Sequence, residues 1–234
     1  MSIVKVSIYQ KNLDDGLNLT SLKKLASLKS DFLLFPEYFY ADSSVKDFRS
    51  IPDKSQYAQD WLLKLNDSYK GVILGGSLIR GTDGARFGSE PIISQGQIVD
   101  WYDKRTPSSE EKEFIQPGGE PGVFILSGSR FGVLLGDDAR NPAFLKELSD
   151  QGVKLIFILQ TAESFDPEQD EELIIKPARE EGLFIVRCCG AGSKFGRALS
   201  GSSLVATPTG ITWRVAPQEA DREILKTVLI AGAS

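Results

Sequence analysis

Residues 131–142, F-G-V-L-L-G-D-D-A-R-N-P, contain the sharpest change of pattern in this chain of 234 residues. An apolar run ends at Gly136, two acids follow, and a helix-like segment begins after Pro142. A tight turn from strand to helix is where several hydrolase folds expose a nucleophile, because the strained turn lifts one side chain above the sheet edge. The residue at this turn is glycine, so the sequence predicts a reactive position without a reactive side chain.

The composition is typical of a soluble globular protein, with 41% hydrophobic and 25% charged residues. The length suits one well-filled domain over residues 1–234. A net charge of −5 argues against a surface that binds nucleic acid. No apolar run approaches the roughly 20 residues of a membrane span, and the first residues lack the pattern of a signal peptide. We therefore expect a cytoplasmic protein with neither nucleic acid nor membrane as a partner.

Histidine is absent, which excludes the Ser-His and Cys-His mechanisms and removes the commonest metal ligand. The two cysteines, Cys188 and Cys189, are adjacent, and neighbouring cysteines rarely form an unstrained disulfide. They end an apolar run, so we expect at least one to be a small buried hydrophobic residue. Any catalysis must depend on carboxylates, lysine, tyrosine, hydroxyls, cysteine or backbone donors.

Apolar strands alternate with helical patterns along the chain. Residues 155–159 are apolar without interruption, which indicates a buried strand in a sheet that helices cover. The Gln95-Gly96 pair predicts a hairpin, which adds antiparallel pairing. Neither a repeat nor a linker divides the core. The sequence predicts an α/β domain with mixed sheets, with strands near 3–9, 31–35, 72–79, 131–135, 183–186 and 224–230 and helices near 17–28, 57–65 and 142–151.

Polar residues follow apolar runs at three places in this pattern. Glu37 comes directly after a buried strand and a proline, Lys104 follows a strand that ends near Tyr102, and Asp137 and Asp138 follow Gly136. Taken in this order, the segments resemble the nitrilase (carbon–nitrogen hydrolase) superfamily over nearly the whole chain. The resemblance rests on Phe35-Pro36-Glu37, Tyr102-Asp103-Lys104, residues 132–142, Ala178-Arg179-Glu180, Gly201-Ser202-Ser203 and Thr207-Pro208-Thr209-Gly210.

The resemblance implies an αββα sandwich that pairs as a homodimer, a small amide-like ligand, and no cofactor or metal. It implies that Glu37 is the general base, that Lys104 stabilises a tetrahedral oxyanion, and that Glu110 is the additional glutamate of the site, with Glu111 as an acceptable substitute. This set makes chemical sense, because a buried carboxylate is a stronger base and can take the proton of a thiol that attacks an amide or nitrile carbon.

The departures from the family pattern lie around the nucleophile. Gly136 stands where the family carries its cysteine, Asp137 where an aromatic residue often follows, and Cys188-Cys189 where a small residue and asparagine are usual. Without the thiol, the acyl-enzyme route has no first step. Two explanations stay open: a natural inactive member retained for binding a ligand or partner, or an amidase whose cysteine at position 136 was removed by engineering.

Asp137 and Cys189 are the residues that we assign to ligand binding. For Asp137 two interpretations remain: it faces water at the turn, or it shares a cavity with Glu37 and Glu110. An alternative from another class is a metal-dependent hydrolase in which Asp137, Asp138 and Glu37 hold Mg²⁺, since oxygen ligands without histidine suit hard cations.

Overall fold

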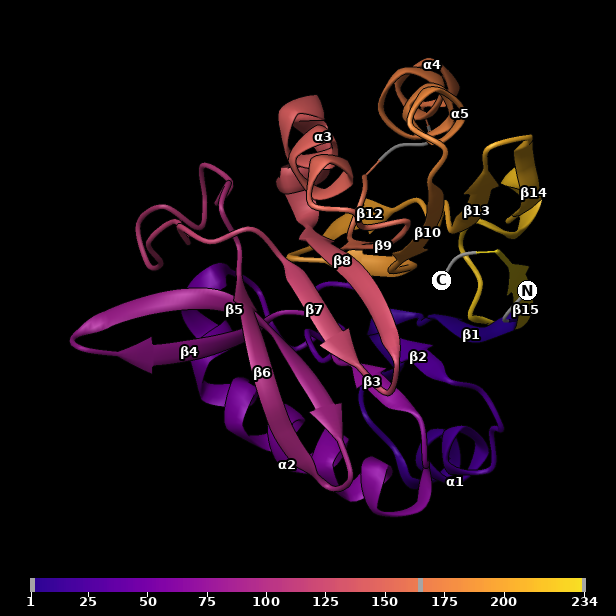
Figure 1. Cartoon of the computed structure of the whole chain (residues 1–234). Helices are drawn as coiled ribbons and strands as arrows, with labels where there is room; N and C mark the ends of the chain where they lie inside the picture. Colours follow the sequence, from indigo (N-terminus) through magenta and orange to yellow (C-terminus); the bar gives the residue numbers. More distant parts are fainter. Residues whose placement is uncertain (1–2, 164–165, 233–234) are drawn as a thin grey trace.

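The computed structural model describes residues 3–163 and 166–232, so the ends of the predicted domain and residues 164–165 lie outside the described part. Two mixed sheets face each other in Figure 1. The first has the order β15-β1-β2-β3-β5-β4, with β6 paired to β5. Its strands are β1 (Ile3–Gln10), β2 (Phe32–Leu34), β3 (Val72–Leu74), β4 (Leu78–Thr82), β5 (Ala85–Ser94), β6 (Gln97–Asp103) and β15 (Ile224–Ala231).

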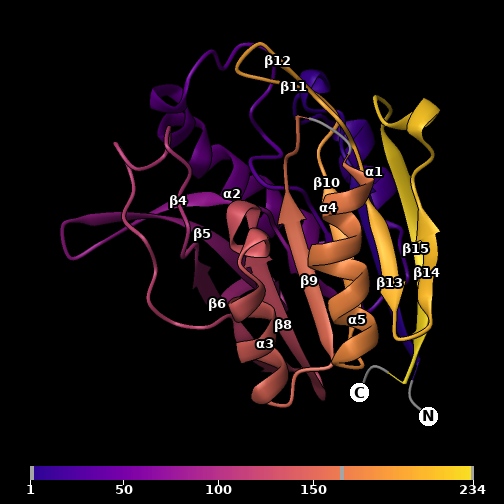
Figure 2. The same cartoon turned by 90° about the horizontal axis from the view of Figure 1, so that it is seen from above.

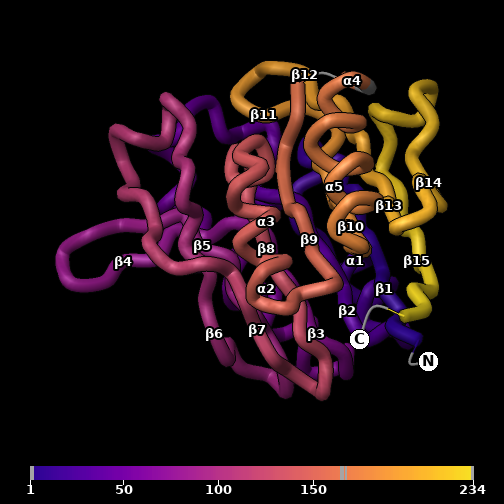
Figure 3. Tube along the Cα trace, turned by 45° about the horizontal axis from the view of Figure 1, so that its top comes forward, coloured from indigo at the N-terminus to yellow at the C-terminus, as the bar shows by residue number. Residues whose placement is uncertain are grey.

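The second sheet has the order β14-β13-β10-β9-β8-β7. Its strands are β7 (Val123–Leu126), β8 (Ser129–Leu135), β9 (Leu155–Gln160), β10 (Phe184–Cys189), β13 (Leu204–Thr207) and β14 (Gly210–Arg214). A short hairpin of β11 (Gly192–Lys194) and β12 (Arg197–Leu199) stands apart from both sheets. In Figure 3 the strands nearest the two ends of the chain, β1 and β15, lie side by side, and they pair along their whole length.

Helices cover the outer face of each sheet, which confirms the predicted αββα sandwich (Figures 1 and 2). The first sheet is covered by α1 (Leu19–Ala26) and α2 (Ile51–Ser68), and the second by α3 (Pro142–Asp150), α4 (Pro167–Asp170) and α5 (Lys176–Glu180), with a π-helical segment, Glu171–Ile175, between the last two. One hydrophobic cluster fills the space between the sheets, and two more lie beneath the helices. In the described ranges, no helix combines the length and the apolar character that crossing a bilayer requires.

The predicted strand at 72–79 is interrupted in the structure, so this prediction was wrong in its extent. Gly75 and Gly76 separate β3 from β4, and Gly76 has a φ of +69°. A Cβ atom at Gly76 would lie 2.2 Å from the carbonyl oxygen of Pro36. The glycine is therefore required where this turn packs against the segment that leads to Glu37.

Parallel pairing brings the ends of several strands to one edge. β1, β2 and β3 are parallel neighbours in the first sheet, and β8, β9 and β10 are parallel neighbours in the second. Parallel strands place their carboxyl ends together, which is where ligands bind in open α/β sheets. Glu37 follows β2 in the first sheet and Gly136 follows β8 in the second. The two residues lie at the same end of the sandwich, because a Cβ atom at Gly136 would be 2.7 Å from Oε1 of Glu37.

Candidate functional site

The turn after β8 has the backbone of a strained elbow. Gly136 has a φ of +49°, in the left-handed region that residues with a Cβ rarely adopt. A 3₁₀ turn, Gly136–Arg140, follows, and α3 begins at Pro142. The side chain of Asn141 caps this helix by accepting a hydrogen bond from the backbone N–H of Ala143 at 3.1 Å. The cap and the proline start the helix where the sequence predicts it.

Asp138 joins this elbow to the loop that carries Lys104. Its carboxylate is fully buried and accepts hydrogen bonds from the Tyr102 hydroxyl at 2.8 Å and from the backbone N–H groups of Thr106 at 2.6 Å and Arg105 at 3.2 Å. The carboxylate thus faces the protein interior and fixes the distance between two parts of the site.

We expect Asp138→Asn to lower the free energy of unfolding by about 2 kcal/mol, because an amide has one acceptor oxygen for several buried donors and directs its own N–H groups at them. Urea denaturation measures the change. The matched control is Asp137→Asn, since Asp137 is 37% exposed and its ion-pair partner is the exposed Arg140 at 3.1 Å. Equal stabilities of the two variants would contradict this role for Asp138.

Lys104 lies between two carboxylates in the interior of the site. Its Nζ is 2.7 Å from Oε1 of Glu37 and 2.7 Å from Oε2 of Glu111. All three side chains are at most 4% exposed. Glu111 also accepts hydrogen bonds from the backbone N–H of Ser108 at 2.6 Å and from the Tyr38 hydroxyl. Buried charges are tolerated only when they are paired, and both carboxylates here are paired with the Lys104 ammonium.

The environments of the two glutamates push their pKa values in opposite directions. Burial raises the pKa of Glu37, although Lys104 opposes the rise. Burial also acts on Glu111, but there Lys104 and the hydrogen bonds from Lys104, Tyr38 and Ser108 outweigh it and lower the pKa. Burial alone would lower the pKa of Lys104, but the two carboxylates raise it and keep the ammonium charged. Glu37 is therefore the carboxyl group suited to exchange protons.

Position 136 points directly at this pair of groups. A Cβ atom built on Gly136 would lie 2.7 Å from Oε1 of Glu37, 2.7 Å from Nζ of Lys104 and 2.9 Å from Oε2 of Glu37. Both neighbours are the far ends of flexible side chains, which can move aside. A side chain at position 136 would thus meet a base and an ammonium group at once.

The site opens into a cavity of about 530 Å³, a size suited to a small molecule. Glu110 lines the cavity at its rim and not beside Lys104, since its half-exposed carboxylate pairs with Arg197 at 2.8 Å. Of the two neighbouring acids, Glu111 contacts Lys104, so the structure favours the substitute, Glu111, over Glu110 as the additional glutamate of the site. Asp137 also lines the cavity, where it pairs with Arg140.

One signal in the sequence could have distinguished Glu111 from Glu110. Ser108 and Glu111 have the spacing S-x-x-E of a capping box, in which each side chain bonds to the backbone N–H of the other residue. The structure has this pair: Ser108 N–H donates to Glu111 at 2.6 Å, and Glu111 N–H lies 3.4 Å from Ser108 Oγ. The box holds the Glu111 side chain at the turn.

Both cysteines are fully buried and neither lines the cavity. Cys188 faces the core between the sheets, with its Sγ 3.3 Å from the carbonyl oxygen of Tyr9, and burial raises the pKa of its thiol. Cys189 Sγ lies 3.5 Å from the hydroxyl of Ser202. The structure therefore does not bring Cys189 to the ligand, contrary to its predicted place in the binding site.

The three carboxylates of the metal alternative face different partners. Asp138 is turned toward Tyr102 and the backbone, Asp137 pairs with Arg140, and Glu37 pairs with Lys104. Within residues 3–163 and 166–232, no group of three or more His, Cys, Asp or Glu side chains is arranged to hold a metal ion. The geometry thus gives no support to a magnesium site here.

The sequence analysis missed the contribution of the β11–β12 hairpin. Lys194 lines the cavity and donates to the Thr161 hydroxyl at 2.8 Å, and Arg197 pairs with Glu163 at 3.0 Å in addition to Glu110. The strands of this hairpin are three residues each, too short to show a hydrophobic alternation in the sequence. Their charged residues reach the site only through the fold.

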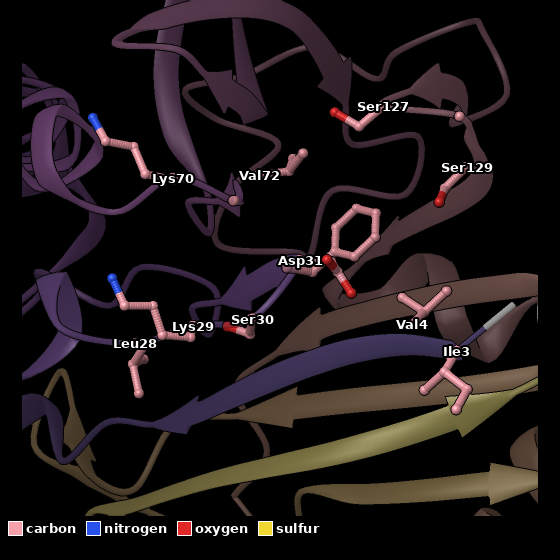
Figure 4. Close-up of a pocket in the computed structure, with 13 residues that line it drawn as sticks. Ile3, Val4, Leu28, Lys29, Ser30, Asp31, Lys70, Val72, Ser127 and Ser129 are labelled. Carbon is pink, nitrogen blue, oxygen red and sulfur yellow. The ribbon is translucent and has the colours of Figure 1, made fainter.

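Another cavity, of about 600 Å³, lies at the opposite edge, where β1, β2 and β3 begin (Figure 4). Lys29 and Lys70 extend away from Ser127 and Ser129 in this view, and the Lys70 ammonium donates to the carbonyl oxygen of Asp67 at 2.7 Å. Asp31 accepts a hydrogen bond from the backbone N–H of Lys5 at 2.7 Å. None of the predicted site residues lines this cavity.

Comparison with known proteins places the chain in a family. The sequence model of the carbon-nitrogen hydrolase family matches residues 3–231. A 2-oxoglutaramate amidase from Bacillus subtilis is 27% identical over 217 residues, which are 88% of this chain and 83% of that protein. A glutamine-dependent NAD(+) synthetase from Acinetobacter baylyi is 22% identical over 187 residues, 77% of this chain, and the match spans only 35% of the synthetase.

The fold agrees with that of solved structures. The crystal structure of an amidase from Nesterenkonia sp. superimposes with a TM-score of 0.81 at 19% identity, covering 97% of this chain and 90% of the amidase. The family match extends over almost all of the described residues. The chain belongs to the carbon-nitrogen hydrolase family, within the nitrilase superfamily.

Proposed function

We propose that this chain is a member of its family that binds a small carboxamide or carboxylic acid without hydrolysing it, because position 136 lacks the nucleophile. The observation that supports this proposal is the position of the Cβ atom that Gly136 lacks, 2.7 Å from both Glu37 and Lys104. The base, the ammonium group and the elbow are all in place around a residue that cannot attack. Related proteins that are described as amidases support an amide or acid as the ligand.

The groups that remain can hold such a ligand. Lys104 is charged and can donate to a carbonyl or carboxylate oxygen, and Glu37 and Glu111 can accept from an amide N–H. A buried, preorganised set of donors and acceptors loses little entropy when it binds. The wild-type site therefore has the hydrogen-bonding groups needed to bind an amide or acid, although it lacks the nucleophile.

A covalent intermediate has no other source in the described site. Cys188 and Cys189 are buried away from the cavity, and the chain has no histidine. The residues lining the cavity include Ser108, Ser109 and Thr161. A hydroxyl acts as a nucleophile only with an adjacent general base, and the Thr161 hydroxyl instead accepts a hydrogen bond from the Lys194 ammonium at 2.8 Å. Loss of the nucleophile in a catalytic unit removes nearly all of its rate.

We expect the wild-type chain to release no ammonia from small aliphatic amides above the uncatalysed background, and to gain no acyl mass on incubation with them. Ammonia assays and intact-protein mass spectrometry test this, with Cys189→Ala as the control variant. Hydrolysis by the wild type that Cys189→Ala abolishes would overturn the proposal. Binding of the same amides, followed by changes in NMR spectra of the protein, is the positive result. The homodimer and the cytoplasmic location stay predictions.

A further inference from the structure

The cavity at Glu37 and Lys104 adjoins a second hollow that none of the functional arguments above uses. This outer groove has a volume of about 500 Å³, and three phenylalanines line it: Phe48, Phe114 and Phe195. Glu110 and Arg197 line both hollows, so their ion pair forms the wall between them. In Figure 2 the β11–β12 hairpin, which carries Phe195 and Arg197 at its tip, lies at the edge toward which β9 points.

The wall can open at little cost. Arg197 lies 2.8 Å from Glu110 and 3.0 Å from Glu163, and all three side chains are between 44% and 53% exposed. Ion pairs this exposed to water contribute little to stability, so a ligand can displace them. The inner cavity and the outer groove can then be occupied by one molecule.

Phe195 is an unusual residue for its position. It has a φ of +54° and is followed by Gly196 with a φ of +76°, in the two-residue turn of the hairpin. Asn-Gly is the usual sequence for such a turn, because a bulky side chain is disfavoured in the left-handed region. The Phe195 side chain is partly buried against the hydrophobic cluster beneath the helices of the first sheet, and it also lines the outer groove. A ring held at a strained position and facing a groove is available to a ligand as well as to the core.

Three phenylalanines and six charged residues line the groove, and the phenylalanines give an aromatic occupant a surface on which to pack. Phe48 and Phe114 lie with ring centroids 5.3 Å apart and an angle of 34° between their planes, and Phe195 contributes a third ring. Arg49 and Arg197 add cationic groups at the rim, which are attracted to the face of an aromatic ring. Offset stacking and burial in such a groove stabilise a phenyl group beyond its area alone.

We propose, on the basis of the function proposed above, that the ligand is a carboxamide or carboxylic acid with an aromatic tail. The head group lies in the inner cavity beside Lys104 and Glu37, and the tail passes Arg197 into the outer groove against Phe195 and Phe114. We therefore expect an arylalkyl amide or acid to bind more tightly than a short aliphatic one.

Binding of two pairs of amides to the full chain tests this inference: phenylacetamide against acetamide, and phenylpropanamide against propanamide. In the wild type we expect the phenyl group to tighten binding at least about tenfold in one pair, which corresponds to about 1.4 kcal/mol. Phe195→Ala should reduce this gain to about twofold. Phe195→Leu, which keeps apolar bulk but no ring, should give an intermediate gain.

The control variants show whether the gain in affinity from the phenyl group depends on the Phe195 ring. Alanine has a Cβ as phenylalanine does, so the strain of the turn stays similar in Phe195→Ala. Phe87→Ala is a matched truncation of a partly exposed phenylalanine outside both hollows, and should leave the gain intact. Equal gains in the wild type and Phe195→Ala, or no gain in the wild type, would overturn this inference alone. If neither kind of amide binds, the proposed function fails as well.

Discussion

Gly136→Cys is expected to hydrolyse small amides that the wild type leaves intact, with a rise in kcat/KM of at least about 10³-fold over the wild-type background. The size follows from how catalytic units behave, since removal of a nucleophile costs roughly 10⁶-fold in kcat in a well-studied protease. We expect the variant to recover only part of this factor, because the side chains around the new cysteine must shift to make room for it. Ammonia release from the variant and the wild type measures the gain.

The chemistry of the variant follows from the geometry at the elbow. Glu37 takes the proton of the new thiol, the sulfur forms a bond to the amide carbon, and Lys104 stabilises the charge that develops on the oxygen. The carbon–nitrogen bond breaks as the nitrogen receives the proton, and water then cleaves the thioester to release the acid. The rate should rise with pH as Glu37 loses its proton. Because burial raises the pKa of Glu37, we expect this rise at a pH above the usual pKa range of a glutamate.

A cysteine fits this position with modest strain. The left-handed backbone costs a residue with a Cβ about 1 kcal/mol, and the ends of Glu37 and Lys104 must shift to make room. Gly136→Ala is the matched control, because it adds the same Cβ without the thiol and should stay inactive. A folded Gly136→Cys protein that shows no activity would mean that the site lacks more than the nucleophile needed for hydrolysis.

Lys104→Met is expected to lower the free energy of unfolding at pH 8 by about 3 kcal/mol, since it leaves two buried carboxylates without their cation. The loss should shrink at acidic pH, where protonation neutralises Glu37 and Glu111. Without the ammonium, the folded-state pKa values of both carboxyl groups lie above their unfolded-state values. The variant is therefore most stable below the unfolded-state pKa values and loses stability as pH rises from them through the folded-state values. Urea denaturation at several pH values measures this.

Two controls accompany Lys104→Met. Lys146→Met removes an exposed lysine that forms an ion pair with the exposed Asp150, and should change stability little. The combination of Lys104→Met with Glu37→Gln and Glu111→Gln removes all three charges and should recover part of the loss. A Lys104→Met protein as stable as the wild type across the pH range would contradict the pairing described here.

The strand ends that carry Glu37 and Gly136 could be predicted from sequence because each follows a short, continuous apolar run, which is typical of a buried strand. The two strands belong to different sheets, so it is the family resemblance, and not strand pairing, that predicts the meeting of these residues. The layers of the sandwich follow from the same alternation of strands and helices. The apolar pattern is the main determinant of these strand ends and of the layers, so the sequence is sufficient for them.

The details that were missed depend on contacts without a periodic signal. The choice between Glu110 and Glu111 is decided by the capping pair with Ser108, and adjacent acids otherwise look alike. Cys189 ends its strand at the edge of the site, yet its side chain packs against Ser202. Lys194 reaches the cavity from a short hairpin whose position is set by the tertiary fold alone.

The measurement that tests the central claim most directly is the intact mass of Gly136→Cys after incubation with a small amide and an acid quench. If the pocket is complete except for its nucleophile, this variant carries one acyl group, while the wild type and Gly136→Ala carry none. The buried Cys188 and Cys189 are common to all three proteins and cannot account for a difference. A folded Gly136→Cys protein without the added mass and without turnover, or an acyl group on the wild type, would contradict the account.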